Sequence, residues 1–202
     1  MSLQILPLRK KDYPKLIDFA ITGMNFSKYT DSKLALRLYG RYFLYLELER
    51  STHILATYEG DQLAGVLMAK MASSPHLYSS FFHKIYVKFF DWLMKRFASG
   101  GDSYDAINKS MLSSFLKKHF PDGEICFLAV NPALKGQGIG SFLLDEFSKI
   151  QKGKLIYLYT NSYCTYKFYD KKGFTQSQKR DIKMDLSGKK VPLTCFLYSK
   201  QL

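Results

Sequence analysis

The feature that most constrains the fold is a run of apolar residues that leads directly into a glycine-rich segment. Residues 124–132 (EICFLAVNP) have the composition of a buried strand, and residues 135–141 (KGQGIGS) place three glycines at alternate positions. An amphipathic segment follows. A strand, a tight turn and a helix start in this order bring several backbone N–H groups and the positive end of the helix dipole onto one anion. The segment therefore predicts a site for a phosphorylated cofactor at the end of a strand.

Spacing distinguishes among the phosphate-binding loops. A P-loop has lysine and then serine or threonine after its last glycine, but here Ser141 follows Gly140 directly. A dinucleotide fingerprint has glycine where Ser141 stands and an acid after the next strand, whereas residues 155–161 (LIYLYTN) end without one. The coenzyme A pattern, Gln/Arg-x-x-Gly-x-Gly/Ala, fits residues 135–140 with one change, since Lys135 replaces the usual glutamine or arginine. Lysine keeps the positive charge, so the loop favours coenzyme A.

A second motif lies downstream. Asn161 ends the next predicted strand, and residues 169–174 (YDKKGF) form a Tyr-x-x-x-Gly-Phe pattern. The two motifs, in this order over residues 124–174, resemble the two signatures of the GNAT N-acetyltransferase superfamily. The resemblance implies one N-acetyltransferase domain over residues 1–202. It also implies acetyl-CoA as co-substrate, no metal, and direct attack by a primary amine in a ternary complex.

The resemblance also assigns roles to individual residues. Tyr169 aligns with the general acid of the family, and Glu124 matches the position of the base in histone-type members. A bound water, Glu47 or Glu49 are alternatives for the base. Asn161 is expected either to contact the cofactor or to cap the following helix. The expected contacts to acetyl-CoA are Leu128, Ala129, Val130, Lys135, Gly136, Gln137, Gly138, Ile139, Gly140, Ser141 and Asn161.

The remaining pattern predicts a mixed fold. Asp12 is expected to cap one helix and Asp31 to begin a second helix before the first hairpin. Apolar runs bounded by polar turns predict strands over residues 3–8, 53–58, 63–69, from 174 onward and 193–198, with a turn at 187–190. Helices interleaved with strands indicate an α/β or α+β domain. With the resemblance, the expected architecture is a GNAT-type mixed, mostly antiparallel central sheet flanked by helices.

Residues 75–121 predict a helical insertion at a place where the family has only a short turn, broken at residues 98–102. In its first half, an apolar residue recurs every four positions and cations flank the stripe. The apolar residues are Phe81, Ile85, Phe89 and Leu93, and the cations are Lys84, Lys88, Lys95 and Arg96. Three interpretations stay open. They are packing on the sheet, a lid over the acceptor groove or a homodimer contact, and a basic amphipathic helix on a membrane surface.

Composition limits the other function classes. The net charge is +13, but the basic residues are spread along the chain, which gives nucleic-acid binding little support. The 3 cysteines and 4 histidines lack ligand spacing, and Cys164 has no neighbouring histidine to activate it as a nucleophile. No apolar run long enough for a transmembrane helix or signal peptide is seen, so a cytoplasmic location is expected.

The acceptor is left open by the sequence. Small metabolites, polyamines, aminoglycosides, peptide termini and protein lysines are all compatible with amine acetylation. The aromatic residues of the second predicted helix either line the acceptor groove or belong to the core; they are Tyr39, Tyr42, Phe43 and Tyr45. A non-catalytic acyl-CoA-binding regulatory or interaction module is the alternative function, and the presence of Tyr169 argues against it.

Overall fold

The computed structural model describes residues 2–28, 30–77, 79–97, 101–186 and 189–202. Its strands form one seven-stranded sheet in the order β1-β2-β3-β4-β5-β7-β6. The strands are β1 Leu3–Leu6, β2 His53–Glu59, β3 Gln62–Met71, β4 Gly123–Val130, β5 Leu155–Asn161, β6 Thr175–Leu186 and β7 Lys189–Gln201. All neighbours are antiparallel except β4 and β5, which are parallel. The predicted mixed, mostly antiparallel sheet is confirmed.

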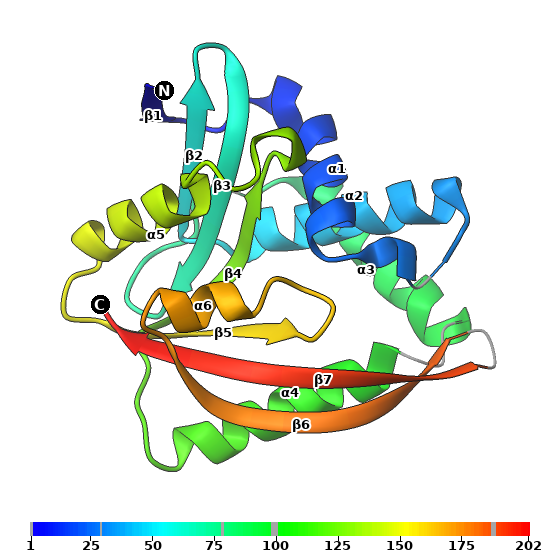
Figure 1. Cartoon of the computed structure of the whole chain (residues 1–202). Coiled ribbons are helices and arrows are strands. Elements are labelled where there is room, and N and C mark those ends of the chain that lie inside the picture. Colours follow the sequence, from blue (N-terminus) through cyan, green and yellow to red (C-terminus); the bar gives the residue numbers. More distant parts are fainter. Residues whose placement is uncertain (1, 29, 78, 98–100, 187–188) are drawn as a thin grey trace.

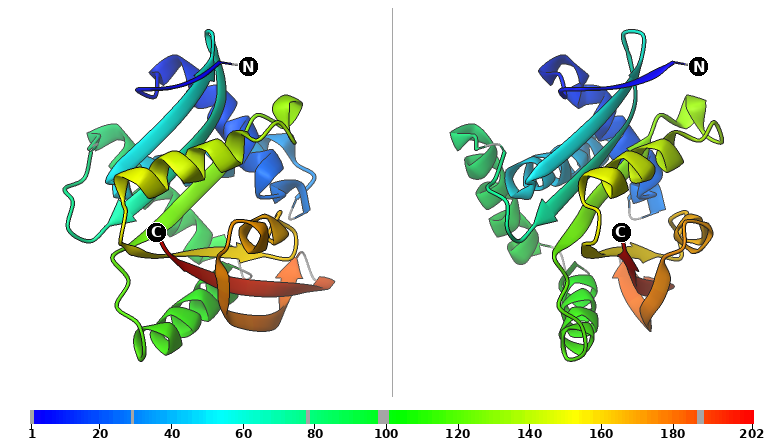
Figure 2. Two further views of the ribbon diagram at one scale, coloured as in Figure 1. Left: turned by 60° about the vertical axis from the view of Figure 1, so that its left-hand side comes forward. Right: turned by 90° about the vertical axis from the view of Figure 1, so that its left-hand side faces the viewer.

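Helices cover both faces of this sheet (Figures 1 and 2). The α-helices are α1 Tyr13–Gly23, α2 Lys33–Arg50, α3 Phe81–Phe97, α4 Gly101–Leu116, α5 Ile139–Ile150 and α6 Lys167–Lys171. Short 3-10 helices span Lys10–Asp12, Phe26–Lys28 and Pro132–Leu134. Helices α5 and α6 lie on one face, and α1, α2 and α4 lie on the other. No helix in the described part of the chain has the length and apolarity needed to cross a membrane.

Strand β3 lies near the middle of the molecule, with helices packed over both of its faces. Every residue from 63 to 69 is buried, which explains its nearly continuous apolar sequence. At Gly65, a Cβ atom would lie 3.0 Å from both the carbonyl oxygen of Ala129 and the Cγ2 atom of Ile139. This glycine therefore allows α5 to pack directly on the sheet, next to the segment that carries the glycine motif.

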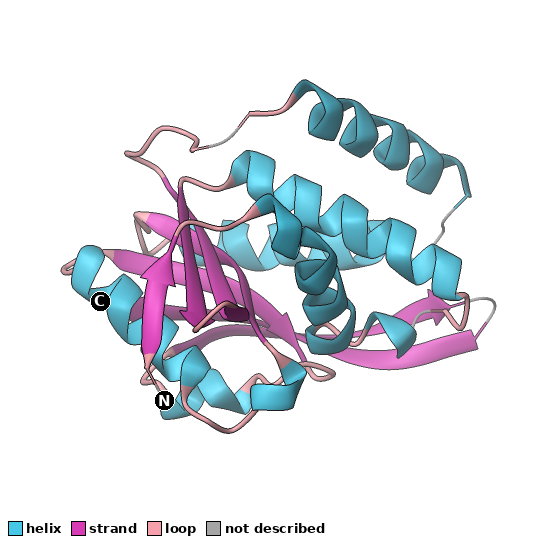
Figure 3. Cartoon of the chain, turned by 90° about the horizontal axis from the view of Figure 1, so that it is seen from above, coloured by secondary structure: helices cyan, strands magenta, loops and turns pink. Residues whose placement is uncertain are grey.

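The two helices of the insertion pack in different places. Helix α4 lies on β6 and β7, where Met111 and Phe115 join a buried cluster with Leu197. Helix α3 packs on α2 and forms an outer layer, which Figure 3 shows from above. Packing on the sheet is thus correct for the second helix and wrong for the first. The predicted break at 98–102 and the turn at 187–190 fall partly outside the described residues.

Helix α1 begins directly after Asp12, as predicted, but the Asp12 side chain does not cap it, and the start predicted at Asp31 requires correction. Asp12 precedes α1, but its carboxylate accepts a hydrogen bond from the Tyr58 hydroxyl at 3.1 Å and caps no backbone N–H group. Helix α2 begins two residues after Asp31, with Ser32 as its cap, and the Ser32 hydroxyl accepts from the N–H of Ala35 at 3.3 Å. In the first case β2 supplies a partner from far along the chain, which local sequence does not reveal.

Candidate active site

Strands β4 and β5 diverge soon after they begin. Their pairing covers only Gly123 with Ile156 and Glu124 with Tyr157, whereas β4 pairs with β3 as far as Val130. Figure 1 shows the two strands running in different directions beyond this point. We call the side of residues 125–130 that faces β5 the divergent edge of β4.

The backbone pattern shows which groups lie on the divergent edge. The N–H of Asn131 donates to the Ala64 carbonyl of β3 at 2.8 Å. Because backbone groups alternate in direction along a strand, Ala129 also bonds toward β3, and Leu128 and Val130 direct their N–H and C=O groups to the divergent edge. Two of the three predicted backbone contacts on β4 therefore face the side opposite β3, and Ala129 does not.

The glycine-rich loop at the start of α5 has the geometry of an anion-binding site, and we call it the anion cradle. Gly138 is the N-cap with φ 80°, and Gly136 has φ 88°, a left-handed conformation that glycine adopts without strain. A Cβ atom at either position would meet nothing within 4 Å, so the space before the helix is open. The first intrahelical bond runs from the Phe142 N–H to the Gly138 carbonyl at 2.9 Å. The N–H groups of residues 139–141 therefore point out of the helix end, as an anion requires.

Side chains around this loop differ in whether they are exposed and can contact a ligand. Lys135 and Gln137 are exposed beside the cradle, whereas Ile139 is buried in the core and has only its backbone N–H to give. A Cβ atom on Gly140 would lie 3.3 Å from the ring of Phe168 on α6. The absence of a side chain at Gly140 therefore permits the close approach of α5 and α6.

The second motif ends α6 in a defined way. Gly173 has φ 73° and donates its N–H to the Asp170 carbonyl at 3.1 Å, while the N–H of Phe174 donates to the Tyr169 carbonyl at 3.0 Å. This pair of bonds is a Schellman motif, which needs glycine at the left-handed position and an apolar residue after it. The Gly-Phe pair therefore fixes the end of the five-residue helix that carries Tyr169.

The Tyr169 side chain is half-buried among other rings. It packs against Phe174 at 5.5 Å and Tyr198 at 5.9 Å between ring centroids. Burial, with a smaller contribution from nearby Cys164, raises the pKa of the Tyr169 phenol above its ordinary value of 10.0. The phenol is therefore protonated at neutral pH and can donate a hydrogen bond.

Asn161 has a local structural role. It is buried at the end of β5, and its side-chain oxygen accepts the N–H of Tyr163 at 2.9 Å. Helix α6 begins only at Lys167, so Asn161 caps the turn that precedes the helix and not the helix itself. The predicted contact of Asn161 with a cofactor stays a prediction.

Glu124 belongs to a buried ionic cluster. It lies where β4 and β5 are still paired, and it accepts hydrogen bonds from Arg50 at 3.1 Å and from the Tyr157 hydroxyl at 3.3 Å. Arg50 also donates to Glu47 at 2.7 Å, so one guanidinium bridges two carboxylates. Arg50 was not among the site residues predicted from the sequence. Its spacing of three residues after Glu47 on one helix was the available signal.

Burial dominates the electrostatics of this cluster. Desolvation, with a smaller contribution from the Glu124 charge, raises the pKa of Glu47 from its ordinary 4.5 to about 7 despite the opposing effect of Arg50. Burial, followed by the nearby Glu124 charge, raises the pKa values of Tyr157 and Tyr159. Burial likewise raises the pKa of the Cys126 thiol. The cluster therefore contains a carboxyl group that changes charge near neutral pH.

Other candidates lie elsewhere. Glu49 accepts the N–H of Ser80 at 2.7 Å, and its carboxylate lies 3.7 Å from a ring nitrogen of His83 on α3. Phe43 packs edge-on against Phe127 of β4 in the core, while Tyr42 stacks on Phe90 of α3. These aromatic residues of α2 therefore hold the core and α3.

Within the described ranges, no group of three His, Cys, Asp or Glu residues is placed to hold a metal ion.

Known families and structures resemble this chain. The sequence model of the family described as Acetyltransferase (GNAT) domain matches residues 110–176, from α4 to the start of β6. No curated protein sequence matches the chain.

Three solved structures illustrate the shared fold. The PaiA N-acetyltransferase of Thermoplasma acidophilum, in complex with coenzyme A, is 17% identical over 100% of both chains, with a TM-score of 0.53. PH1933 of Pyrococcus horikoshii is 17% identical over 100% of both chains, with a TM-score of 0.56. A Corynebacterium glutamicum protein, described as histone acetyltransferase HPA2 and related acetyltransferase, is 16% identical over 98% of this chain and 96% of its own, with a TM-score of 0.53.

The family match covers the segment in which the structure has placed both motifs, the divergent edge of β4 and the anion cradle of α5. Residues 110–176 are thus similar to the GNAT acetyltransferase domain, and the whole chain shares the fold of solved acetyltransferases.

Proposed function

We propose that the chain is an N-acetyltransferase that moves the acetyl group of acetyl-CoA onto a primary amine. The observation that carries this proposal is the strand divergence between β4 and β5. One end of the divergent edge leads to an anion cradle, and the other end begins at a buried carboxylate pair.

The donor substrate fits the backbone of this region. The cradle at residues 136–141 suits a diphosphate, because the glycines leave space and the N–H groups point outward. The divergent edge at Leu128 and Val130 suits the amide groups of a pantetheine chain, which can pair with it as an added strand. An N–H group on that edge would also stabilise negative charge on the thioester oxygen during attack. The Thermoplasma acidophilum relative, solved in complex with coenzyme A, supports this assignment.

The acceptor must lose a proton before it attacks. A free alkylammonium has a pKa of about 10.4, so a base is needed at neutral pH. With both carboxylates ionised, Glu47, Arg50 and Glu124 together carry one net negative charge in a buried setting, and uptake of a proton neutralises them. We assign the contact with the amine to Glu124, because it lies on the strand that borders the site. Glu47 and Arg50 set the charge of the cluster.

Tyr169 is assigned to the departing sulfur. As the new C–N bond forms and the C–S bond breaks, the electron pair moves to sulfur, whose thiol has a pKa of about 8.5. The phenol of Tyr169 has a higher pKa, so complete transfer of its proton is uphill, whereas a hydrogen bond to the developing thiolate is favourable. The nitrogen loses its second proton to water as the amide forms, and the thiolate takes up a proton from water as the product leaves.

Thiol release from acetyl-CoA in the presence of a panel of amines tests this function. We expect at least one amine class to raise the rate of thiol release well above the rate without amine. The panel consists of polyamines, aminoglycosides, amino acids, peptides with free N-termini and lysine-containing peptides. Binding of coenzyme A without amine-dependent release for any of them would contradict the proposal and support the non-catalytic acyl-CoA-binding module.

A further inference from the structure

Helix α3 is anchored to α2 by one face only. Phe90 stacks on Tyr42 with ring centroids 4.9 Å apart, and His83 stacks on Tyr45 at 3.8 Å. The Tyr42 hydroxyl donates to Asp91 at 2.6 Å. These contacts fix the rotation of α3 about its axis and therefore determine which of its residues face outward.

The outward face of α3 is apolar, which is unusual for an outer layer. We call it the α3 apolar face. It comprises Phe81, Phe82, Ile85, Phe89 and Trp92, of which Phe82 is 79% exposed and Trp92 59% exposed. Single exposed apolar residues are common on protein surfaces, but five on one helix face form a contiguous patch, and such patches mark interaction sites.

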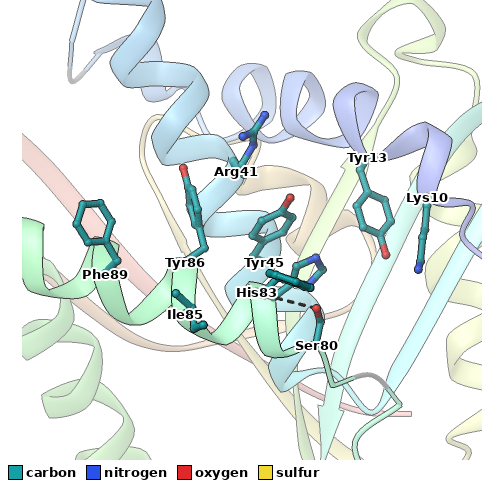
Figure 4. A pocket seen from close by; sticks show the side chains of 10 residues that line it. Lys10, Tyr13, Arg41, Tyr45, Ser80, His83, Ile85, Tyr86 and Phe89 are labelled. Carbon is teal, nitrogen blue, oxygen red and sulfur yellow. Dashed lines mark hydrogen bonds between the residues drawn. The ribbon is translucent and has the colours of Figure 1, made fainter.

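Cations border the α3 apolar face on both sides. At 100° per residue, exposed Lys84 and Lys88 lie on the edge next to Phe81. At the opposite edge, Phe82 and Phe89 help to line a pocket of about 590 Å³ between α1, α2 and α3. Lys10 and Arg41 also line this pocket (Figure 4). An apolar strip thus lies between two rows of positive charge.

These charges favour one kind of partner over another. A second copy of the chain, packed face to face, would bring the lysines and arginines of both copies close together. The sequence of α3 contains one acidic residue, Asp91, and its carboxylate already accepts the Tyr42 hydroxyl. An anionic lipid surface instead offers negative headgroups to the cations and a hydrocarbon boundary to the aromatic rings.

We propose that the α3 apolar face docks the protein on the surface of an anionic membrane. The aromatic and aliphatic side chains enter the boundary between headgroups and acyl chains, while Lys84, Lys88, Lys10 and Arg41 contact lipid phosphates. The helix lies in the plane of the interface, since its inner face stays packed on α2. This surface is separate from the cradle of α5 and from the divergent edge of β4.

The sole tryptophan of the chain reports directly on this docking, because Trp92 lies in the α3 apolar face. The full chain is mixed with vesicles of phosphatidylcholine alone or of phosphatidylcholine with phosphatidylglycerol. We expect Trp92 fluorescence to shift to shorter wavelength with the mixed vesicles only, and brominated acyl chains to quench it. Added salt should weaken the effect, since headgroup attraction is screened. No shift and no co-sedimentation with mixed vesicles at low salt would overturn the proposal.

Matched variants separate this surface from general basicity. The double variant Lys84→Gln, Lys88→Gln should lower vesicle partitioning roughly 10- to 30-fold, at about a factor of five per cation. The control double variant Lys179→Gln, Lys183→Gln removes two exposed cations from β6 and should have little effect. An equal loss in both variants would show non-specific attraction and refute the assignment.

The apolar contribution has its own control. Phe89→Ser should lower partitioning about tenfold, whereas Phe120→Ser, at a side chain 89% exposed beyond α4, should leave it unchanged. Light scattering across a concentration series tests the competing occupant. A dimer that Phe89→Ser abolishes, together with no vesicle binding, would assign the surface to a second copy and overturn the membrane proposal.

Discussion

Two glycines in this chain share one conformation but only one of them lies in the proposed cradle. Gly138 has φ 80° and Gly153 has φ 79°, and a Cβ atom at either would meet nothing within 4 Å. Gly138 caps the start of α5, whereas Gly153 follows its end and donates its N–H to the Leu202 carbonyl at 2.8 Å. Valine at each position therefore imposes similar backbone strain while changing only one candidate site.

The two substitutions should differ in binding and agree in stability. A non-glycine residue in the left-handed region costs about 1–2 kcal/mol, so both Gly138→Val and Gly153→Val should lower Tm by about 2–8 °C. Only the side chain at position 138 fills the space before the α5 N-terminus. Losing two charge-assisted hydrogen bonds to a diphosphate, at about 1.5–3 kcal/mol each, raises Kd about 10²- to 10⁴-fold.

Calorimetric titration with coenzyme A and thermal melts of both variants measure these quantities. Wild type and Gly153→Val should bind with the same Kd, and Gly138→Val should bind far more weakly. If Gly138→Val and Gly153→Val bound coenzyme A equally well, the diphosphate would not lie at the start of α5. The role assigned to the glycine motif would then be refuted.

Three further predictions concern the proton-transfer groups and the helix packing. Tyr169→Phe should lower turnover about 10²-fold without lowering Tm; unchanged turnover in the thiol assay would remove the phenol from the mechanism. The pKa of Glu47 is raised in the folded chain to about 7 from 4.5, so the folded state holds the proton more tightly, and stability should fall as pH rises from 4.5 to 7. In urea titrations the wild type should lose about 3 kcal/mol more than Glu47→Gln across this range, and parallel pH profiles would contradict the assignment. Gly65→Ala places a Cβ atom 3.0 Å from the Ala129 carbonyl oxygen and should destabilise the fold by about 1–3 kcal/mol. In Gly23→Ala the new Cβ atom meets nothing within 4 Å, so this control should not be destabilised. Equal melting temperatures for the two variants would disprove the packing argument.

Local sequence was sufficient where a motif determines its own conformation. Alternating glycines predicted a tight turn and a helix start after the cofactor strand, and Gly136 and Gly138 adopt the positive φ that such a turn uses, because glycine does so without strain. Gly173 of the second motif has φ 73° and ends α6 in the same way. Long alternating or continuous apolar runs located the strands on each side of these motifs.

Local sequence did not predict side-chain orientation where a residue far along the chain determines it. Helix α3 is apolar around most of its circumference, so periodicity could not show whether Phe89 or Phe90 would face α2. In the structure, Phe90 faces α2, where it stacks on Tyr42. Likewise, Tyr58 of β2 takes the carboxylate of Asp12 that was expected to cap α1.

The buried ionic cluster was predicted from the sequence only in part. The position of Glu124 in the motif marked it as a candidate, but its burial and its pairing with Arg50 depend on how the end of α2 lies against β4. The shift of the Glu47 pKa has the same origin, since desolvation depends on tertiary packing and not on sequence neighbours.

A crystal structure of the chain with coenzyme A tests the central claim most directly. We predict diphosphate oxygens about 3 Å from the backbone nitrogens of residues 138–141, and a pantetheine chain hydrogen-bonded to Leu128 and Val130. A ligand bound elsewhere, or a β4–β5 divergence filled by protein side chains in the presence of saturating ligand, would contradict the account.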